Sequence, residues 1–129
     1  MNAKHYFEKA RVAAHSAQLL LDAGDADGAC NRAYYAMFDA ARGALIGSGA
    51  VPNVLEIKTH AGLISMFSLH LIKTGLVDID ASKHLNQVQE MRLIADYLGD
   101  GIELAKAQVA IGMAKDFIEK LSNLSTFSP

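Results

Sequence analysis

The chain has 129 residues, a formal net charge of -2 and a single cysteine, Cys30, a length typical of one domain. Because the chain has no excess of basic residues, we do not expect it to bind DNA over a broad surface, although a local basic patch is not excluded. A single cysteine excludes an internal disulfide framework. Because the sequence has neither an apolar signal core at "MNAKHYFEKA" nor an apolar run of the roughly 18 residues that span a membrane, we expect a cytoplasmic protein that contacts neither membrane nor DNA.

Five amphipathic segments separated by glycine-containing breaks predict an all-α protein. Apolar residues recur at helical spacing over residues 3–23, 26–46, 59–73, 80 or 82 to 98, and 102–123. We predict an up-and-down bundle of four long helices with a fifth, shorter helix. It forms one domain over residues 1–125, followed by a frayed tail at 126–129. Asp25 or Asp27 is available to cap the second helix. One side of the fifth helix is predicted to carry Val109, Ala110, Met113, Phe117 and Leu121.

The second predicted helix carries two stripes of side chains. The apolar stripe, expected to face the core, contains Cys30, Ala33, Tyr34, Met37, Phe38, Ala41, Ala44 and Leu45. The other stripe contains Arg32, Tyr35, Asp39, Arg42 and Ile46, at the spacing of a coiled-coil seam. A polar stripe of this kind is either a solvated face with ordinary ion pairs or a second interface. Arginine and tyrosine suit an interface to a partner chain or to a phosphate-bearing ligand.

The fourth predicted helix carries an arginine at the margin of its core stripe. That stripe contains Leu85, Val88, Met91, Ala95 and Leu98. Asp96 follows Arg92 by four residues on the same side, whereas Tyr97 lies on another face. Such an arginine is either a snorkelling side chain paired with its carboxylate or a positive group at the lip of a cleft.

Three stretches, "NRAYYAMFDAARGALI" (31–46), "KTHAGLISMF" (58–67) and "RLIADY" (92–97), resemble a largely uncharacterised branch of the HEPN superfamily. The name stands for higher eukaryotes and prokaryotes nucleotide-binding, and the likeness covers nearly the whole chain. The resemblance implies a helical bundle that commonly forms a homodimer. Many such proteins are encoded beside a minimal nucleotidyltransferase and act with it as a toxin–antitoxin pair. Others bind nucleotides or cleave RNA without a metal ion.

The ribonucleases of this superfamily carry an arginine followed, after four to six residues, by a histidine. Arg92 matches the arginine by position, but Tyr97, Leu98 and Gly99 stand where the histidine would be. Tyrosine, with an ordinary pKa of about 10, replaces histidine poorly near neutral pH. Relatives in this branch also often carry a histidine where this chain has Asp39. We therefore expect no cleavage by the usual mechanism.

The remaining acid–base candidates are Asp96 and His60, with Arg92 able to stabilise charge. A carboxylate acts as a base near neutral pH only where burial raises its pKa. His60 is a structural residue near a helix start unless it faces Arg92, in which case it is the best acid–base candidate. No Glu-x-x-His pair occurs, and the histidine pairs ten residues apart cannot share one ion, so we expect no metal and no cofactor.

We expect a component of a toxin–antitoxin-like pair with a nucleotidyltransferase-like partner, binding nucleotide or RNA. The resemblance places Arg32, Tyr35, Asp39, Arg92, Asp96 and Tyr97 in the pocket or interface. Tyr97 is the kind of residue that such a partner modifies. Two alternatives stay open: a non-catalytic interaction or dimerisation module, and an active metal-independent ribonuclease that uses His60 or Asp96.

Overall fold

The computed structural model describes residues 2–49, 58–97 and 101–124, and all regular elements in these ranges are helical. They are α1 (Ala3–Asp22), α2 (Ala26–Ser48), α3 (His60–Phe67), the π-helical turn η2 (Ser68–Ile72), α4 (Ile79–Tyr97) and α5 (Leu104–Ser122). The predicted all-α bundle is thus confirmed, with boundaries within a few residues of those expected. Within the described ranges, none of the helices is long and apolar enough to cross a membrane. The predicted helix end at Leu98 and the predicted tail at 126–129 lie outside these ranges.

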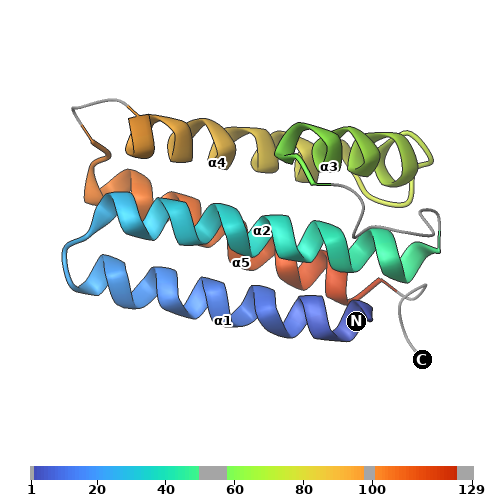
Figure 1. Ribbon diagram of the computed structural model, residues 1–129, viewed down its shortest axis with the longest axis horizontal. Helices are drawn as coiled ribbons and strands as arrows, with labels where there is room; N and C mark the ends of the chain where they lie inside the picture. The colour runs from blue at the N-terminus through green and yellow to red at the C-terminus, as the bar shows by residue number, and fades with distance from the viewer. Residues whose placement is uncertain (1, 50–57, 98–100, 125–129) are drawn as a thin grey trace.

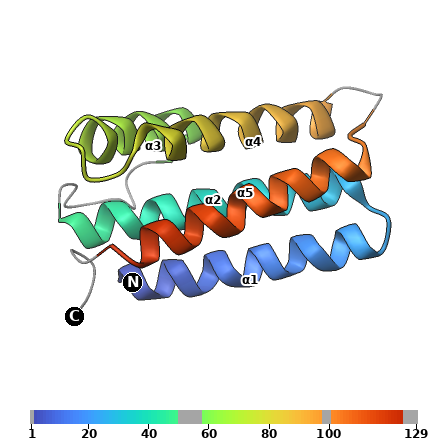
Figure 2. The ribbon, with the colours of Figure 1, turned by 180° about the vertical axis from the view of Figure 1, so that it is seen from behind.

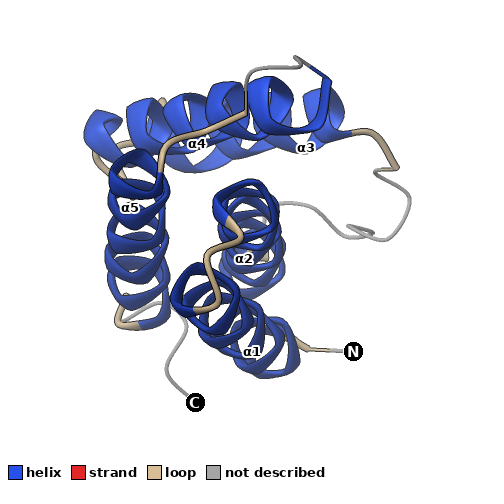
Figure 3. Cartoon of the chain, turned by 90° about the vertical axis from the view of Figure 1, so that its left-hand side faces the viewer, coloured by secondary structure: helices blue, strands red, loops and turns tan. Residues whose placement is uncertain are grey.

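Helix α2 lies at the centre of the bundle. Figures 1 and 2 show α1, α2 and α5 running along the long axis, with α3 and α4 forming a further layer. The view along the bundle in Figure 3 places this layer on the opposite side of α2 from α1. Accordingly, α2 contacts α1, α3, α4 and α5. A polar stripe on α2 therefore meets other helices, which excludes a freely solvated face for most of it.

Side-chain caps and glycines set the helix ends. The Asp25 side chain accepts a 2.8 Å hydrogen bond from the Gly28 amide at the start of α2, and Thr59 accepts one of 2.9 Å from Gly62 at the start of α3. These caps satisfy amides that have no partner within the helix. Of the two aspartates predicted as caps, Asp25 is the one used. Asp27 instead accepts a 2.8 Å hydrogen bond from the Ile102 amide, which ties the start of α2 to the approach to α5.

Helices α1 and α2 approach each other closely because small residues line their contact. A Cβ added to Gly43 would lie 3.2 Å from both the carbonyl oxygen of Ala3 and the ring of Phe7. Buried alanines on both helices extend this contact, so little side-chain volume separates the two backbones. Polar side chains of α2 on this side are consequently shielded from water.

Two details differ from the sequence-based expectation. Val109 was predicted on one side of α5 with Ala110 and Phe117, but unlike these two residues it is 51% exposed. The buried stripe of α5 runs through Ala107, Ala110, Ile111, Ala114, Phe117, Ile118 and Leu121. At about 100° per residue, Val109 lies on the side opposite Ala107. In addition, the third predicted helix continues beyond Phe67 as the π-helical turn η2 rather than as an α-helix.

Replacing Gly112 by alanine is expected to stabilise the fold. Gly112 lies inside α5, is exposed, and an added Cβ would meet nothing within 4 Å. Alanine restricts the unfolded backbone more than glycine does, so the free energy of unfolding should rise by about 0.5–1 kcal/mol. Urea unfolding followed by circular dichroism measures the change.

The matched control is Gly101→Ala. Gly101 has φ = +74°, and an added Cβ would lie 3.3 Å from the Asp27 carboxylate, so this substitution should lower the free energy of unfolding. Equal effects of the two substitutions would contradict the backbone conformations described above.

Candidate functional site

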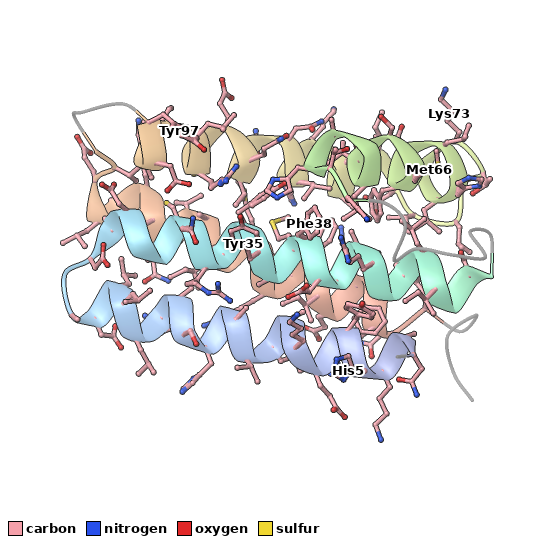
Figure 4. The ribbon with its side chains drawn as sticks, in the orientation of Figure 1. His5, Tyr35, Phe38, Met66, Lys73 and Tyr97 are labelled. Atoms are coloured by element: carbon pink, nitrogen blue, oxygen red, sulfur yellow. The ribbon has the colours of Figure 1, made fainter. Side chains whose placement is uncertain are left out.

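Four rings from two helices gather between α2 and the α3–α4 layer. Tyr34, Tyr35 and Phe38 belong to α2, and the imidazole of His60, the first residue of α3, contacts all three. The centroid of the His60 ring lies 5.2 Å from that of Tyr34, 5.6 Å from Tyr35 and 4.8 Å from Phe38. Figure 4 shows Tyr35 and Phe38 on α2, below this layer. The two tyrosines of the "YY" pair therefore meet at one site, although the sequence assigned them to different faces.

Three of the chain's four arginines lie against these rings. The guanidinium carbon of Arg92 is 5.4 Å from the ring centroid of Tyr34 and 5.7 Å from that of Tyr35. That of Arg32 lies 5.7 Å from Tyr35, and that of Arg42 lies 4.9 Å from Phe38. These are cation–π distances. We call the set Arg32, Tyr34, Tyr35, Phe38, Arg42, His60 and Arg92 the arginine–aromatic cluster.

Asp96 holds Arg92 in place, and Asn31 holds Asp96. The Nε atom of Arg92 lies 3.1 Å from Oδ2 of Asp96, with the two side chains 13% and 27% exposed. The contact is an ion pair rather than an aligned hydrogen bond, because this buried Nε has no hydrogen-bond partner in the described part of the chain. The Asn31 side-chain amide donates to Asp96 at 3.2 Å, which joins α2 to α4. Sequence reasoning missed Asn31, although it directly precedes Arg32.

The buried hydroxyl of Tyr34 has no hydrogen-bond partner among the described residues. Burial raises the pKa of Tyr34 to about 12, against a smaller opposing effect of the Arg92 charge. The hydroxyl thus keeps its proton at any physiological pH and remains an unused donor. A buried polar atom without a partner is unfavourable by itself, and such atoms often mark functional sites.

His60 sits in surroundings that favour its neutral form. Its pKa is lowered from the ordinary value, first by burial and then by the charges of Arg92 and Arg42. The positive end of the α3 backbone dipole also lies at this residue. The imidazole is consequently uncharged near pH 7 and can accept a proton. His60 and Arg92 both lie against Tyr34 and Tyr35, and the Arg92 charge acts on the imidazole, so His60 stays an acid–base candidate.

The charges of Arg32 and Arg42, with which Asp39 was predicted to form a stripe, act on its carboxyl, but Asp39 is buried. It is only 9% exposed, and the charges acting on it include those of Lys9 and His5 on α1. The reason is the close contact of α1 with α2, which covers the Asp39 side of α2. Burial raises the pKa of the Asp39 carboxyl, and the charges of Lys9, Arg42, Arg32 and His5 offset this rise only in part.

The remaining candidates lie outside the cluster. Tyr97, the last residue of α4, is 73% exposed, and Figure 4 places it away from Tyr35 and Phe38. Burial and the Asp27 charge raise the pKa of Cys30 to about 11, which makes this thiol unreactive. In the ranges that the structure describes, no three histidine, cysteine or acidic side chains come together in a geometry suited to a metal ion.

Comparisons with known proteins agree with this architecture. The model of the HEPN domain family matches residues 3–124. A UPF0332 protein of Gloeobacter violaceus is 31% identical over 114 residues, which cover 87% of this chain and 86% of that protein. A UPF0332 protein of Thermotoga maritima is 29% identical over 123 residues, covering 94% and 89%. A protein of Methanocaldococcus jannaschii named "Putative toxin" is 30% identical over 90 residues, covering 70% and 58%.

Replacing Asp39 by asparagine is expected to stabilise the protein at neutral pH. Because the carboxyl binds its proton more tightly in the folded protein than in the unfolded chain, its ionisation lowers the free energy of unfolding as pH rises above 3.8. Asparagine cannot ionise, so the free energy of unfolding of the variant should be close to that of the wild type near pH 3.8 and higher than it at pH 7. Urea unfolding at several pH values measures this difference.

The control is Asp116→Asn, which changes an exposed carboxylate on α5 and should leave the pH dependence as it is. A wild-type protein that exceeds Asp39→Asn in stability at pH 7 would show that the attraction of the four neighbouring cations outweighs burial.

Proposed function

Because this chain belongs to the HEPN domain family, we propose that it binds a nucleotide or RNA at the arginine–aromatic cluster, as one component of a toxin–antitoxin-like pair. Two relatives from Methanocaldococcus jannaschii carry the name "Putative toxin", which supports the second part of the proposal. As the resemblance implies, we further propose that two copies associate and that the partner protein is nucleotidyltransferase-like.

One observation carries the ligand proposal: three arginines and a histidine surround three aromatic rings in a chain whose net charge is negative. Guanidinium groups bind phosphate oxygens in pairs, and aromatic rings stack on bases. Tyr35 is half-buried, so part of its ring stays accessible for stacking. The site thus combines the two groups that a nucleotide requires, a cation for phosphate and a flat apolar surface for the base.

The roles of Arg92 and Asp96 follow from their contacts. Arg92 would hold the phosphate, because its guanidinium is fixed over Tyr34 and Tyr35. Asp96 is already engaged by Arg92 and by Asn31, so it orients the guanidinium rather than acting as a base. Tyr97 stays a candidate for modification by the partner, since it is largely exposed at the end of α4.

Ribonuclease activity is a second candidate, which the position of His60 favours. A neutral imidazole next to an arginine can take the proton of a ribose 2′-hydroxyl while the guanidinium stabilises charge on the phosphate. In this chain the imidazole would come from α3 rather than from a histidine that follows Arg92 on α4. Asp96 is the weaker base candidate, because its carboxylate is engaged as described.

Arg92→Gln is expected to lower the affinity for a fluorescent hexauridylate RNA by about tenfold or more, because it removes a charge-assisted contact to phosphate. Fluorescence anisotropy measures the affinity, and circular dichroism and light scattering check folding and association. Lys83→Gln, an exposed change on the same helix, is the control and should bind as the wild type does.

A folded Arg92→Gln variant with wild-type affinity would exclude Arg92 from the binding site. A variant that unfolds or loses its self-association would favour the alternative of a non-catalytic interaction module, with Arg92 and Asp96 as a structural pair.

If the ribonuclease candidate is correct, the protein degrades mixed RNA in the presence of EDTA, and His60→Gln does not. Gel electrophoresis over several hours at micromolar protein measures the loss of full-length RNA. Intact RNA under these conditions would exclude this second candidate and leave the binding proposal unaffected.

A further inference from the structure

Among the described residues, the charges that act on the His60 imidazole are both positive, and burial adds to their effect. Helix α2 presents the rings of Tyr34, Tyr35 and Phe38 together with the Arg42 guanidinium, and α4 presents Arg92. Among the described residues, no carboxylate acts on the charge of His60, and Asp96 is paired with Arg92. Within the described part of the chain, the site therefore contains cations and a neutral base, with no carboxylate among the charges that act on that base.

A bound phosphate would reverse this balance. Its negative charge would lie against Arg92, beside the imidazole, and would favour the charged form of His60. The Tyr34 ring lies against both His60 and Arg92, and its buried hydroxyl has no partner among the described residues. The hydroxyl is a donor, as phosphate oxygens require.

We propose that His60 takes up one proton when a phosphate-bearing ligand binds against Arg92, and thereby becomes a cationic contact to that phosphate. This inference rests on the proposed function, and it assigns to His60 a role in binding that does not depend on cleavage. The step is a proton transfer, in which hydronium or a buffer acid gives up a proton and an N–H bond forms on the imidazole. The site then distinguishes nucleotides from nucleosides, because an uncharged nucleoside would not raise the pKa of His60.

The sign of the pH dependence follows from linkage. The free imidazole is neutral at pH 7, and the bound phosphate raises its pKa, so binding takes up a proton. The affinity for the phosphate-bearing ligand should therefore increase as pH falls. The increase should end at the pH at which His60 of the free protein also becomes protonated. One linked proton changes the affinity by at most tenfold per pH unit.

The test measures the affinity for hexauridylate without a terminal phosphate, at several values between about pH 6 and about pH 8. The charge of this probe is constant in that range, so any change in affinity comes from the protein. The wild type should bind more tightly at the lower pH, and His60→Gln should bind with an affinity that does not vary with pH. His15→Gln, an exposed change on α1, should keep the wild-type pH dependence.

Isothermal titration calorimetry in two buffers of different ionisation enthalpy counts the protons taken up on binding. If His60→Gln does not fold, NMR of the wild-type imidazole with and without the probe measures the change in the pKa of His60 instead. Net proton uptake and a raised pKa of the bound His60 support the inference. Tight binding without proton uptake, or an unchanged pH dependence in His60→Gln, overturns it while the proposed function stands. No binding of hexauridylate at any pH overturns both.

Discussion

The site of this protein depends on the contact between the Arg92 guanidinium and the rings of Tyr34 and Tyr35. This contact joins α4 to the central helix, and it places a permanent charge between two aromatic surfaces with little access to water. A cation–π contact of this kind contributes about 0.5–2 kcal/mol, with the larger values where water is excluded. Asp96 and Asn31 then fix the direction of the guanidinium. Burial first, and the Arg92 charge second, favour the neutral form of His60, and the buried hydroxyl of Tyr34 has no partner among the described residues.

In this chain of net negative charge, three arginines gather at aromatic rings of α2. Arg32, Arg42 and Arg92 surround the aromatic rings, whereas Asp39 is buried on the side of α2 that α1 covers. Arg42 belongs to both environments, because it lies over Phe38 and its charge also acts on Asp39. The two sides of α2 are thus electrostatically linked, and a change at Asp39 should alter the electrostatics of the arginine–aromatic cluster.

Sequence patterns were sufficient for the helices but only partly for the site. Amphipathic periodicity, glycines and capping residues located the helices, since these signals act locally along the chain. The same periodicity grouped Val109 with buried residues of α5 and assigned Tyr34 and Tyr35 to different faces of α2. Periodicity cannot tell which faces of a helix are covered by neighbouring helices. Helix α2 has neighbours on several sides, so both tyrosines meet Arg92. The contact of His60 with the rings joins two distant segments, and no spacing rule reports such a contact. Asn31 was missed for the same reason, since its partner Asp96 is 65 residues away.

The most direct test of the ligand site is side-chain NMR of the four arginines during titration with hexauridylate. Each Nε–Hε group gives its own signal, and Arg11, on an exposed position of α1, is an internal reference. If the arginine–aromatic cluster binds the RNA phosphates, the signals of Arg32, Arg42 and Arg92 should shift together while that of Arg11 stays in place. Shifts confined to Arg11, or binding without any change at Arg92, would contradict the account.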